Sequence, residues 1–569
     1  MTAIADLPPG FLMIAGSLLL PSLGRRMQAW AVLMLSAASL VVFVLTPVGN
    51  YGNMTLFGAD LNLVRIDSIS RPFGIVFHLA AIISAIYALH VRDTRQHVAG
   101  VLYAGAAIAA ACSGDLLTLF VFWELTAISS VFLVWASDSE RSYHAGMRYL
   151  IIQVTSGVLL LSGAIVQYVE TGSLTFASMV GPDDSLTLAG KLILVAFGIK
   201  CAFPLLHNWL QDAYPKATVT GTVFLSAFTT KLAVYSLIRG FAGFEPLIWV
   251  GCTMTLFPIV FAVIENDLRR VLAYSLNNQL GFMVVGIGIG TELAINGTVA
   301  HAFCHIIYKS LLFMSMGAVL YRVGTIKATE LGGLHKSMPW TTTFCLIGAG
   351  AISGFPLLSG FVSKSMIISA AAEQHMLGVW IVLLIASAGV MEHSGIKIPF
   401  FAFFAHDSGK RVPEAPRNML VAMALASAGC IVLGIAYPLL YALLPHSLEY
   451  RPYTTTHVVT QLQLLMFACL AFVFLMKTGW YPAEQRATIL DTDWFYRVAI
   501  PRVVSKLRSG IITIDHAVRN ACLKGIGRML VSAGNLFSQT GLLGRTWSTN
   551  SMAFWASALL AASLVIYYL

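Results

Sequence analysis

Charged residues and the common motifs for nucleotides and metals are scarce in this sequence. Only 11% of the 569 residues are Asp, Glu, Lys or Arg, whereas 57% are hydrophobic. The sequence has no Walker A motif, no GxGxxG turn and no HExxH helix. The eight cysteines stand singly, without the spacing of a metal site, and are interpreted as small core residues. We therefore predict no cofactor and no metal, and expect energy to come from an ion gradient or from partner subunits.

A removable signal is also missing. The N-terminus, MTAIADLPPGFLMIAG, has neither a basic start nor an A-x-A-type cleavage site, so we expect the first apolar segment to be retained. The net charge of +9 comes from basic residues in short loops between apolar runs. That placement is typical of membrane topology and predicts no nucleic acid partner.

Long apolar runs make up most of the chain. Runs of roughly 18 to 25 residues recur with almost no charge, and each would cross about 30 Å of hydrocarbon as one helix. The sequence therefore predicts an all-α polytopic protein of about 14–16 transmembrane helices in a lipid bilayer. The expected spans are 11–22, 29–45, 72–90, 98–112, 115–135, 148–168, 190–207, 218–240, 246–264, 271–290, 297–321, 342–360, 376–405, 418–443, 458–477 and 552–569.

Basic residues gather on one side of the membrane when these spans are threaded alternately. By the positive-inside rule that side is cytoplasmic, which places the N-terminus on the extracytoplasmic side. The alternation requires that 361–375 does not cross and that 376–405 forms one long, interrupted span. The basic side holds Arg25, Arg26, Arg92, Arg95, Arg141, Arg148, Lys216, Arg269, Arg270, Arg322, Lys336, Lys410, Arg411 and Arg417, and the other side holds mainly Arg65, Arg71 and Arg239.

Two of the predicted spans contain features that interrupt a regular helix. GIKCAFP at 198–204 places a proline one turn after Lys200, and GVMEHSGIKIP at 389–399 combines two glycines with a proline. GFPLLSGF at 354–361 likewise cannot continue a regular helix through its proline. Broken helices at membrane depth commonly line ion pathways. Kinks packed beside snorkelling lysines are the alternative explanation.

Titratable residues inside the apolar runs are the strongest indication of function. A charge near the bilayer centre costs about 2.5 to 3.5 kcal/mol on insertion scales, so the presence of several predicts a role. Burial destabilises a charged lysine and a nearby carboxylate stabilises it, so a lysine with a movable carboxylate partner can act as a proton switch. The candidate residues of a proton path are Glu124, Lys200, Lys231, His301, His305, Lys309, Lys397, Glu392 and His207.

The first four residues along the chain suggest how such a path begins. Glu124 is the only carboxylate in the middle of its span, and Lys200 is its natural partner. Lys231 can pass a proton onward. His207 follows the first predicted break, where it either feeds protons in or caps the broken helix.

The remaining candidates suggest how the path continues. His301, His305 and Lys309 are spaced four residues apart and fall on one helical face, which predicts a polar stripe. Lys397, in the second interrupted span, is the predicted exit group, with Glu392 close by as the alternative.

The chain after residue 477 is too polar to span a membrane until its last segment. Apolar residues between 511 and 536 recur at steps of three or four with basic residues opposite, which predicts an amphipathic helix. This helix would lie along the cytoplasmic interface or across a neighbouring subunit, anchored by the final span at 552–569. A short cytoplasmic helical tail is the alternative.

Six segments of the sequence together resemble one known family. They are FVFWELTAISS, GIKCAFPLLHNWLQDAYPKATVTGTVFLSAFTTKLAVYSLIR, NDLRRVLAYSLNNQLGFM, HAFCHIIYKSLLFM, LGGLHKSMP and ISGFPLLSGFVSKSMI. Between about residues 60 and 420 the chain resembles the antiporter-like subunits of Mrp-type multisubunit Na+/H+ antiporters and of the membrane arm of respiratory complex I.

The resemblance implies two inverted five-helix repeats, each with one broken helix and a half-channel. It also implies that Glu124 pairs with Lys200 and that Lys231 continues a central polar axis through the histidine stripe. The family's distal ionisable residue would lie on the second broken helix, where Lys397 is the best candidate. No quinone, flavin or nicotinamide site is implied in this chain.

The predicted organisation has six parts. They are N-terminal transmembrane helices at 1–97, a first proton-channel repeat at 98–240, a second, inverted repeat at 246–405, C-terminal transmembrane helices at 406–477, an interfacial amphipathic segment at 478–551 and a final transmembrane helix at 552–569.

These observations predict a proton-translocating subunit of a multisubunit monovalent cation (Na+)/proton antiporter, similar to its D-type component, in a bacterial inner membrane. Its partners would be other membrane subunits, and its substrate would be protons, with Na+ left open. One alternative is a proton-pumping membrane subunit of a complex I-like NADH-quinone oxidoreductase or a membrane-bound hydrogenase, which would make the chain part of a translocase enzyme. Another is a membrane subunit that energises inorganic-carbon uptake.

Overall fold

The computed structural model describes residues 6–56, 58–482 and 489–569. The chain divides into two compact units, Met1–Asp491 and Thr492–Leu569. Eleven of the described helices are long and apolar enough to cross a membrane. The chain is therefore a polytopic helical membrane protein, as predicted.

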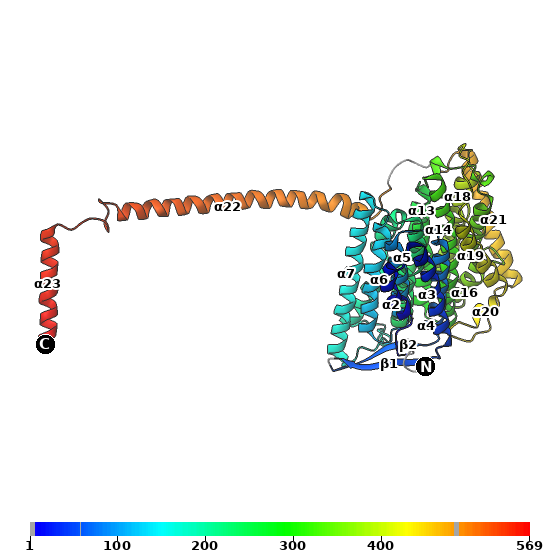
Figure 1. Ribbon diagram of the computed structural model, residues 1–569, viewed down its shortest axis with the longest axis horizontal. Helices are drawn as coiled ribbons and strands as arrows, with labels where there is room; N and C mark the ends of the chain where they lie inside the picture. The colour runs from blue at the N-terminus through cyan, green and yellow to red at the C-terminus, as the bar shows by residue number, and fades with distance from the viewer. Residues whose placement is uncertain (1–5, 57, 483–488) are drawn as a thin grey trace. The chain divides into compact units, whose positions relative to one another are not determined.

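Helices form nearly all of the first unit, and they lie side by side with their long axes in roughly one direction (Figure 1). The first half contains α2 (Phe11–Leu19), α3 (Arg25–Leu45), α4 (Ser70–Tyr87), α5 (Thr94–Ala111), α6 (Leu116–Trp135), α7 (Glu140–Thr171), α8 (Leu188–Lys200), α9 (Asn208–Ala213), α10 (Val219–Ala227) and α11 (Thr229–Phe241). The second half contains α12 (Pro246–Ile264), α13 (Leu268–Ile289), α14 (Glu292–Val323), α15 (Pro339–Ser353), α16 (Ser359–Glu373), α17 (Leu377–Val390), α18 (Lys397–Pro399), α19 (Arg417–Ile435), α20 (Tyr437–Tyr441) and α21 (Thr455–Thr478).

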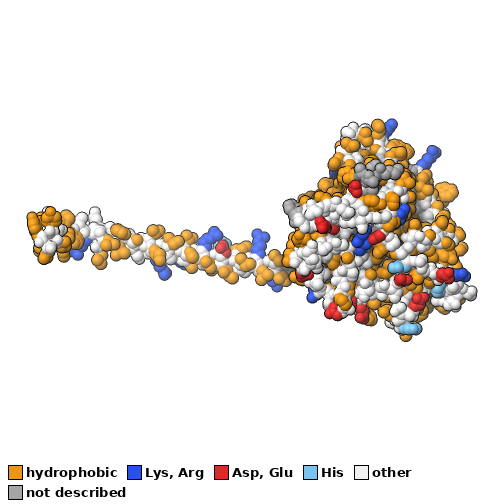
Figure 2. All heavy atoms as spheres, turned by 90° about the horizontal axis from the view of Figure 1, so that it is seen from below, with side chains coloured by type: hydrophobic (Ala, Val, Ile, Leu, Met, Phe, Trp, Pro, Cys, Tyr) orange, Lys and Arg blue, Asp and Glu red, His pale blue; other side chains and the backbone are white. Residues whose placement is uncertain are grey.

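The two ends of the first unit differ in their surface features. At what we call the basic end, Arg95 pairs with Asp138 at 2.7 Å and Lys336 pairs with Asp407 at 2.8 Å. The opposite, hairpin end carries the antiparallel strands β1 (Gly49–Leu56) and β2 (Ala59–Ile66), which the sequence did not predict. Figure 2 looks onto the hairpin end, where acidic and histidine side chains are scattered over the surface and hydrophobic side chains surround it.

Helix α14 runs through the interior of the first unit. Every residue from Leu293 to Val319 is buried. Helices α4, α10, α13, α15, α16 and α19 pack around it. The polar stripe predicted on this helix therefore lies at the centre of the protein.

The first predicted break is present. Helix α8 ends at Lys200 and α9 begins at Asn208. Between them the backbone takes the left-handed conformation at Ala202, with φ 60°, and at Leu205, with φ 70°. Pro204 has no N–H to donate, so it cannot continue the hydrogen-bond ladder of α8.

The helix interruption predicted at 354–361 is present, whereas the one predicted at 389–399 is not. Helix α15 ends at Ser353 and α16 begins at Ser359, so the interruption lies in 354–358 and the segment 361–375 is mostly helical. The predicted interrupted span 376–405 instead runs on without a gap from α17 to Phe404 through two π-helical segments, Met391–Ile396 and Phe400–Phe404. The wider π turns accommodate the glycines and the proline of this segment, which is why it does not break.

The second unit contains two helices. The long helix α22 (Ile500–Phe537) follows a π-helical turn at Phe495–Ala499, and α23 (Thr549–Tyr568) is long and apolar enough to cross a membrane. The predicted C-terminal helix and final span are thus both present as helices.

Candidate functional site

The polar stripe on α14 is fully buried. His301, His305 and Lys309 are each 0% exposed, and the two imidazole ring centres lie 6.1 Å apart. His301 Nδ1 is hydrogen-bonded to the Ser363 hydroxyl of α16 at 3.0 Å, and its Nε2 lies 3.4 Å from the Tyr308 hydroxyl. The stripe therefore connects directly to the helix that follows the second break.

Several polar atoms of this stripe have no hydrogen-bond partner among the described residues. They are both ring nitrogens of His305 and Nζ of Lys309. Buried polar groups are typically satisfied by protein or by ordered water. Such groups suit a hydrated path in which protons move between side chains.

Lys231 lies beside a third helix interruption, which the sequence did not predict. Helices α10 and α11 are separated at Phe228, and Lys231 Nζ donates to the Ser226 carbonyl oxygen at 2.6 Å. The backbone N–H of Thr229 donates to the Tyr103 hydroxyl at 2.9 Å. Neither proline nor glycine marks this break in the sequence, so no local signal could have revealed it.

Lys200 is the last residue of α8 and is 0% exposed. Its Nζ donates to the Trp123 carbonyl oxygen at 2.5 Å and to the Thr126 hydroxyl at 3.0 Å, and it lies 4.3 Å from the centre of the Trp123 ring. Helix α6, which carries both partners, also carries Glu124. The structure thus brings the predicted pair together on adjacent helices.

Glu124 itself is partly exposed and points toward α7. Its Oε1 atom is buried and has no hydrogen-bond partner among the residues described. The carboxylate lies against Gly157, where a side chain would overlap Oε1. Lys200 and Glu124 interact electrostatically, but the hydrogen bonds of Lys200 go to Trp123 and Thr126.

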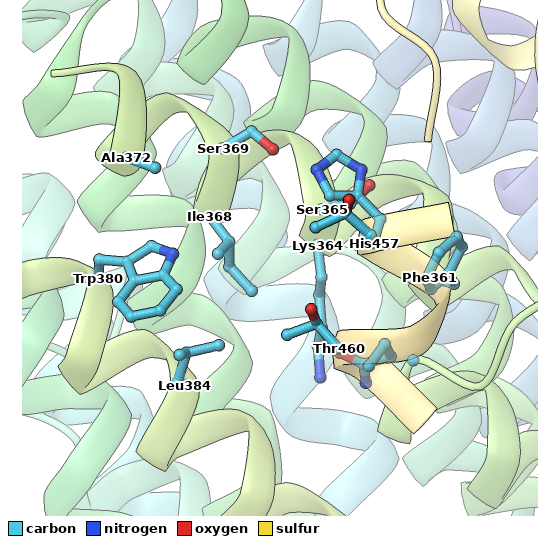
Figure 3. Close-up of a pocket in the computed structure, with 13 residues that line it drawn as sticks. Phe361, Lys364, Ser365, Ile368, Ser369, Ala372, Trp380, Leu384, His457 and Thr460 are labelled. Carbon is cyan, nitrogen blue, oxygen red and sulfur yellow. The ribbon is translucent and has the colours of Figure 1, made fainter. Parts of the chain in front are cut away.

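Lys364 on α16 was not among the predicted site residues. Its side chain is buried, and its Nζ donates to the Ile352 carbonyl oxygen across the second break at 2.7 Å and lies 5.2 Å from the centre of the Phe282 ring. Its neighbour Ser363 bonds to His301. Lys364 also lines a cavity of about 250 Å³ together with His457 of α21 (Figure 3).

The sequence offered a signal for this lysine. Phe-Pro-Leu-Leu occurs both at 203–206 and at 355–358. The two copies also share backbone geometry, because Leu205 and Leu357 are both left-handed, with φ 70° and 72°. The N–H groups of Phe203 and Phe355 both donate to a carbonyl five residues earlier, at 2.9 and 3.0 Å.

Lys397 and Glu392 occupy a different part of the first unit. Lys397 lies in α18 and donates to the Val263 carbonyl oxygen near the end of α12, while Glu392 accepts a hydrogen bond from Tyr481 at 2.9 Å. Glu392 therefore lies in the π-helical segment after α17, and Lys397 lies in the short helix α18 that follows it, so neither lies on the helix that is interrupted at 354–358.

His207 lies at the end of the first break and is 1% exposed. Its side chain makes no capping hydrogen bond to α9, so the capping alternative is not supported. Its ring packs 4.6 Å from the Phe257 ring, and its Nε2 lies 3.3 Å from Oδ2 of Asp491.

Comparison with known proteins gives the family. Residues 113–391 match the family described as NADH:quinone oxidoreductase/Mrp antiporter, TM. NADH-quinone oxidoreductase subunit N from Desulforudis audaxviator is 30% identical over 63% of this chain and 78% of its own length. The chain belongs to this antiporter-like family.

Other similar proteins come from several kinds of assembly. The D-type subunit of the Na(+)/H(+) antiporter of Alkalihalophilus pseudofirmus is 34% identical over 46% of this chain, and hydrogenase-4 component B of Escherichia coli is 28% identical over 66% of it. The chain spans 56% and 63% of the lengths of these two relatives, respectively. In the Mrp complex from Dietzia sp., one chain shares the fold with a TM-score of 0.77 at 22% identity, covering 94% of this chain and 63% of that one.

The fold corrects one site assignment for this antiporter-like chain. The prediction that Lys397 lies on the second broken helix is wrong, because that helix is formed by α15 and α16. The lysine it carries after the break is Lys364. Glu392 also lies outside that broken helix.

Proposed function

We propose that this antiporter-like subunit translocates protons along its central buried axis. The observation that carries the proposal is the series of buried titratable side chains at Lys200, Lys231, the α14 stripe and Lys364. The three lysines named each lie beside a helix interruption. The electrostatic partners of His305 include both Lys231 and Lys364. Such groups are costly in a membrane and are retained where protons or ions pass.

The proposed cycle starts at Lys200. Approach of its ammonium to Glu124 favours the charged form, and the arrangement described above, with Nζ turned to Trp123 and Thr126, is the separated state. Separation lets the ammonium lose its proton toward Lys231. The proton then passes through the α14 stripe to Lys364, which takes the exit role predicted for Lys397. Each transfer moves one proton between nitrogens.

For the orientation we propose that the basic end faces the cytoplasm, following the positive-inside rule. The N-terminus then lies on the extracytoplasmic side of a bacterial cell membrane. Protons leaving Lys364 would emerge toward the hairpin end, past the cavity that Lys364 and His457 line.

For the assembly we propose the D-type position of a multisubunit cation/proton antiporter, because the D-type antiporter relative is similar at 34% identity. A membrane subunit of a hydrogenase or complex I-like enzyme is the second candidate, favoured by the similarity to hydrogenase-4 component B and to NADH-quinone oxidoreductase subunit N. Mass spectrometry of the complex purified through this chain distinguishes them. Small antiporter subunits support the first, and redox subunits support the second.

Proton translocation is tested with the purified complex in liposomes that contain a pH-sensitive dye. A potassium gradient with valinomycin imposes a membrane potential, and the initial rate of the pH change is measured. We expect Lys200→Met to reduce the rate at least about tenfold. Lys191→Met, on the exposed side of the same helix, is the matched control and should transport normally. Normal transport by Lys200→Met would refute the proposed path.

A further inference from the structure

A buried carboxylate from the segment after α21 lies against the first helix break. The Asp491 side chain is 0% exposed. It accepts hydrogen bonds from the Tyr274 hydroxyl at 2.7 Å and from the side-chain amide of Asn208, and its Oδ2 lies 3.3 Å from His207 Nε2. Asn208 begins α9 and His207 ends the break. Asp491 thus contacts both residues at the point where the broken helix resumes.

The described elements packed around this pair carry several other titratable groups. Helix α13 provides Tyr274, and Arg270 lies 5.9 Å from its ring centre and pairs with Glu265 at 3.4 Å. Helix α9 provides Asp212, which pairs with Arg148 of α7 at 2.7 Å and with the ammonium of Lys216. Helix α12 provides the apolar ring of Phe257.

The chemistry of this contact allows proton exchange as well as attachment of the segment. The Tyr274 hydroxyl and the Asn208 amide stabilise the buried carboxylate by donating to it. Here the neighbouring group is an imidazole, which can accept a proton at one ring nitrogen and donate one from the other. A carboxylate and an imidazole at this distance can exchange a proton.

His207 is also placed to pass a proton on. Its Nδ1 atom is buried and has no hydrogen-bond partner among the described residues. The adjacent Trp209 donates from Nε1 to the Ile199 carbonyl oxygen at 2.9 Å, which holds the start of α9 against the end of α8. Lys200 is the next residue after Ile199.

We propose that Asp491 and His207 form a proton-uptake dyad at the basic end, with Tyr274 and Asn208 holding the carboxylate. A proton from the aqueous phase binds the Asp491 carboxylate and moves to His207 Nε2 while His207 releases another from Nδ1 toward Lys200, and tautomer exchange of the neutral ring then returns its proton to Nδ1. Asp491 returns to the carboxylate, so each turn transfers one proton. This dyad rests on the proton translocation proposed above and adds a residue far outside the antiporter-family match.

The test uses the whole complex in the liposome assay, with initial rates measured over a range of pH on the basic-end side. Asp491→Asn keeps the size of the side chain and removes its charge. We expect a rate loss of at least about tenfold. We also expect the pH of half-maximal rate to fall, because a carboxylate favours the protonated form of a neighbouring imidazole. Asp491→Glu should keep more than half of the wild-type rate, which a purely structural role would not predict.

Asp493→Asn is the matched control. Asp493 lies two residues away, is also buried, and pairs with Arg497 at 2.7 Å. Its variant should show the wild-type rate and pH profile. A wild-type profile for Asp491→Asn, or equal losses for the Asn and Glu variants in assembled complex, would overturn the dyad. If the complex does not assemble with Asp491→Asn, the variant His207→Gln is measured instead. Normal transport by His207→Gln also refutes the dyad.

Lys200→Met in the same assay separates this inference from the proposed function. If Lys200→Met is inactive while Asp491→Asn transports normally, the dyad is wrong and the path through Lys200 stands. If Lys200→Met transports normally, both proposals are refuted. Loss in both variants, with Asp493→Asn normal, supports the two together.

Discussion

Lys364 and Ile352 meet across the second helix break, where Lys364 Nζ donates to the Ile352 carbonyl oxygen at 2.7 Å. Ile352 lies two residues before Gly354, the first left-handed residue of that break, just as Lys200 lies two residues before Ala202 in the first break. Both ammonium groups therefore lie at the C-terminal end of the half-helix that precedes a break. The helix dipole favours positive charge at that position. At the first break the ammonium group comes from Lys200 of the preceding helix α8. At the second break it comes from Lys364 of the following helix α16.

This relationship predicts which of two lysines is required for transport. Lys364→Met should reduce the proton transport rate at least about tenfold, because it removes the buried ammonium at the second break. Lys397→Met should have a much smaller effect, because Lys397 lies in the short helix α18, outside that break. The measurement is the initial rate in liposomes containing equal amounts of assembled complex. A larger loss for Lys397→Met would restore the assignment made from sequence.

Glu124 depends on the absence of a side chain at Gly157. A methyl group at that position would overlap Glu124 Oε1, so Gly157→Ala should displace the carboxylate and lower the transport rate several-fold, while the complex still assembles. Gly378→Ala is the control, because a Cβ there meets no atom within 4 Å. Rates and subunit content are measured side by side. An unchanged rate for Gly157→Ala would show that the carboxylate position does not matter.

The break beside Lys231 is predicted to depend on Tyr103. Tyr103→Phe leaves the buried N–H of Thr229 without its acceptor, which costs about 1–3 kcal/mol of stability and loosens the turn that positions Lys231. We expect a lower thermal midpoint and a lower transport rate. Tyr87→Phe removes a comparable buried hydrogen bond, to Met314, but lies away from this turn. It should lower the thermal midpoint alone, and equal transport losses in both variants would contradict the role of Tyr103.

The sequence predicted the first break and the buried lysines Lys200, Lys231, Lys309 and Lys397, because both features depend on residue type. A proline after Lys200 removes a backbone donor wherever it is placed, and a lysine in an apolar run is anomalous in any membrane fold. The second break was misplaced because Pro356 and Pro399 offer the same local signal. Tertiary packing decides that the helix opens at Pro356 and continues through π turns at Pro399.

Other parts of the site depend on contacts that no local pattern encodes. The interruption at Phe228 has neither glycine nor proline, and the Tyr103 hydroxyl that satisfies it comes from another helix. Asp491 reaches His207 from more than 250 residues away in the chain. The repeated Phe-Pro-Leu-Leu was the one overlooked signal, and it would have directed attention to the helix that carries Lys364.

The two breaks also differ at one equivalent position, which gives a stability prediction. Ala202 is buried and left-handed, with φ 60°, whereas the corresponding residue of the second break is glycine, Gly354, with φ 78°. A left-handed conformation costs a residue with a Cβ about 1–2 kcal/mol, and glycine adopts it without that penalty. Ala202→Gly should therefore match or raise the thermal midpoint, and the converse variant, Gly354→Ala, should lower it. Differential scanning fluorimetry of the purified complex measures both, and a rise for Gly354→Ala would show that backbone strain does not limit stability at these breaks.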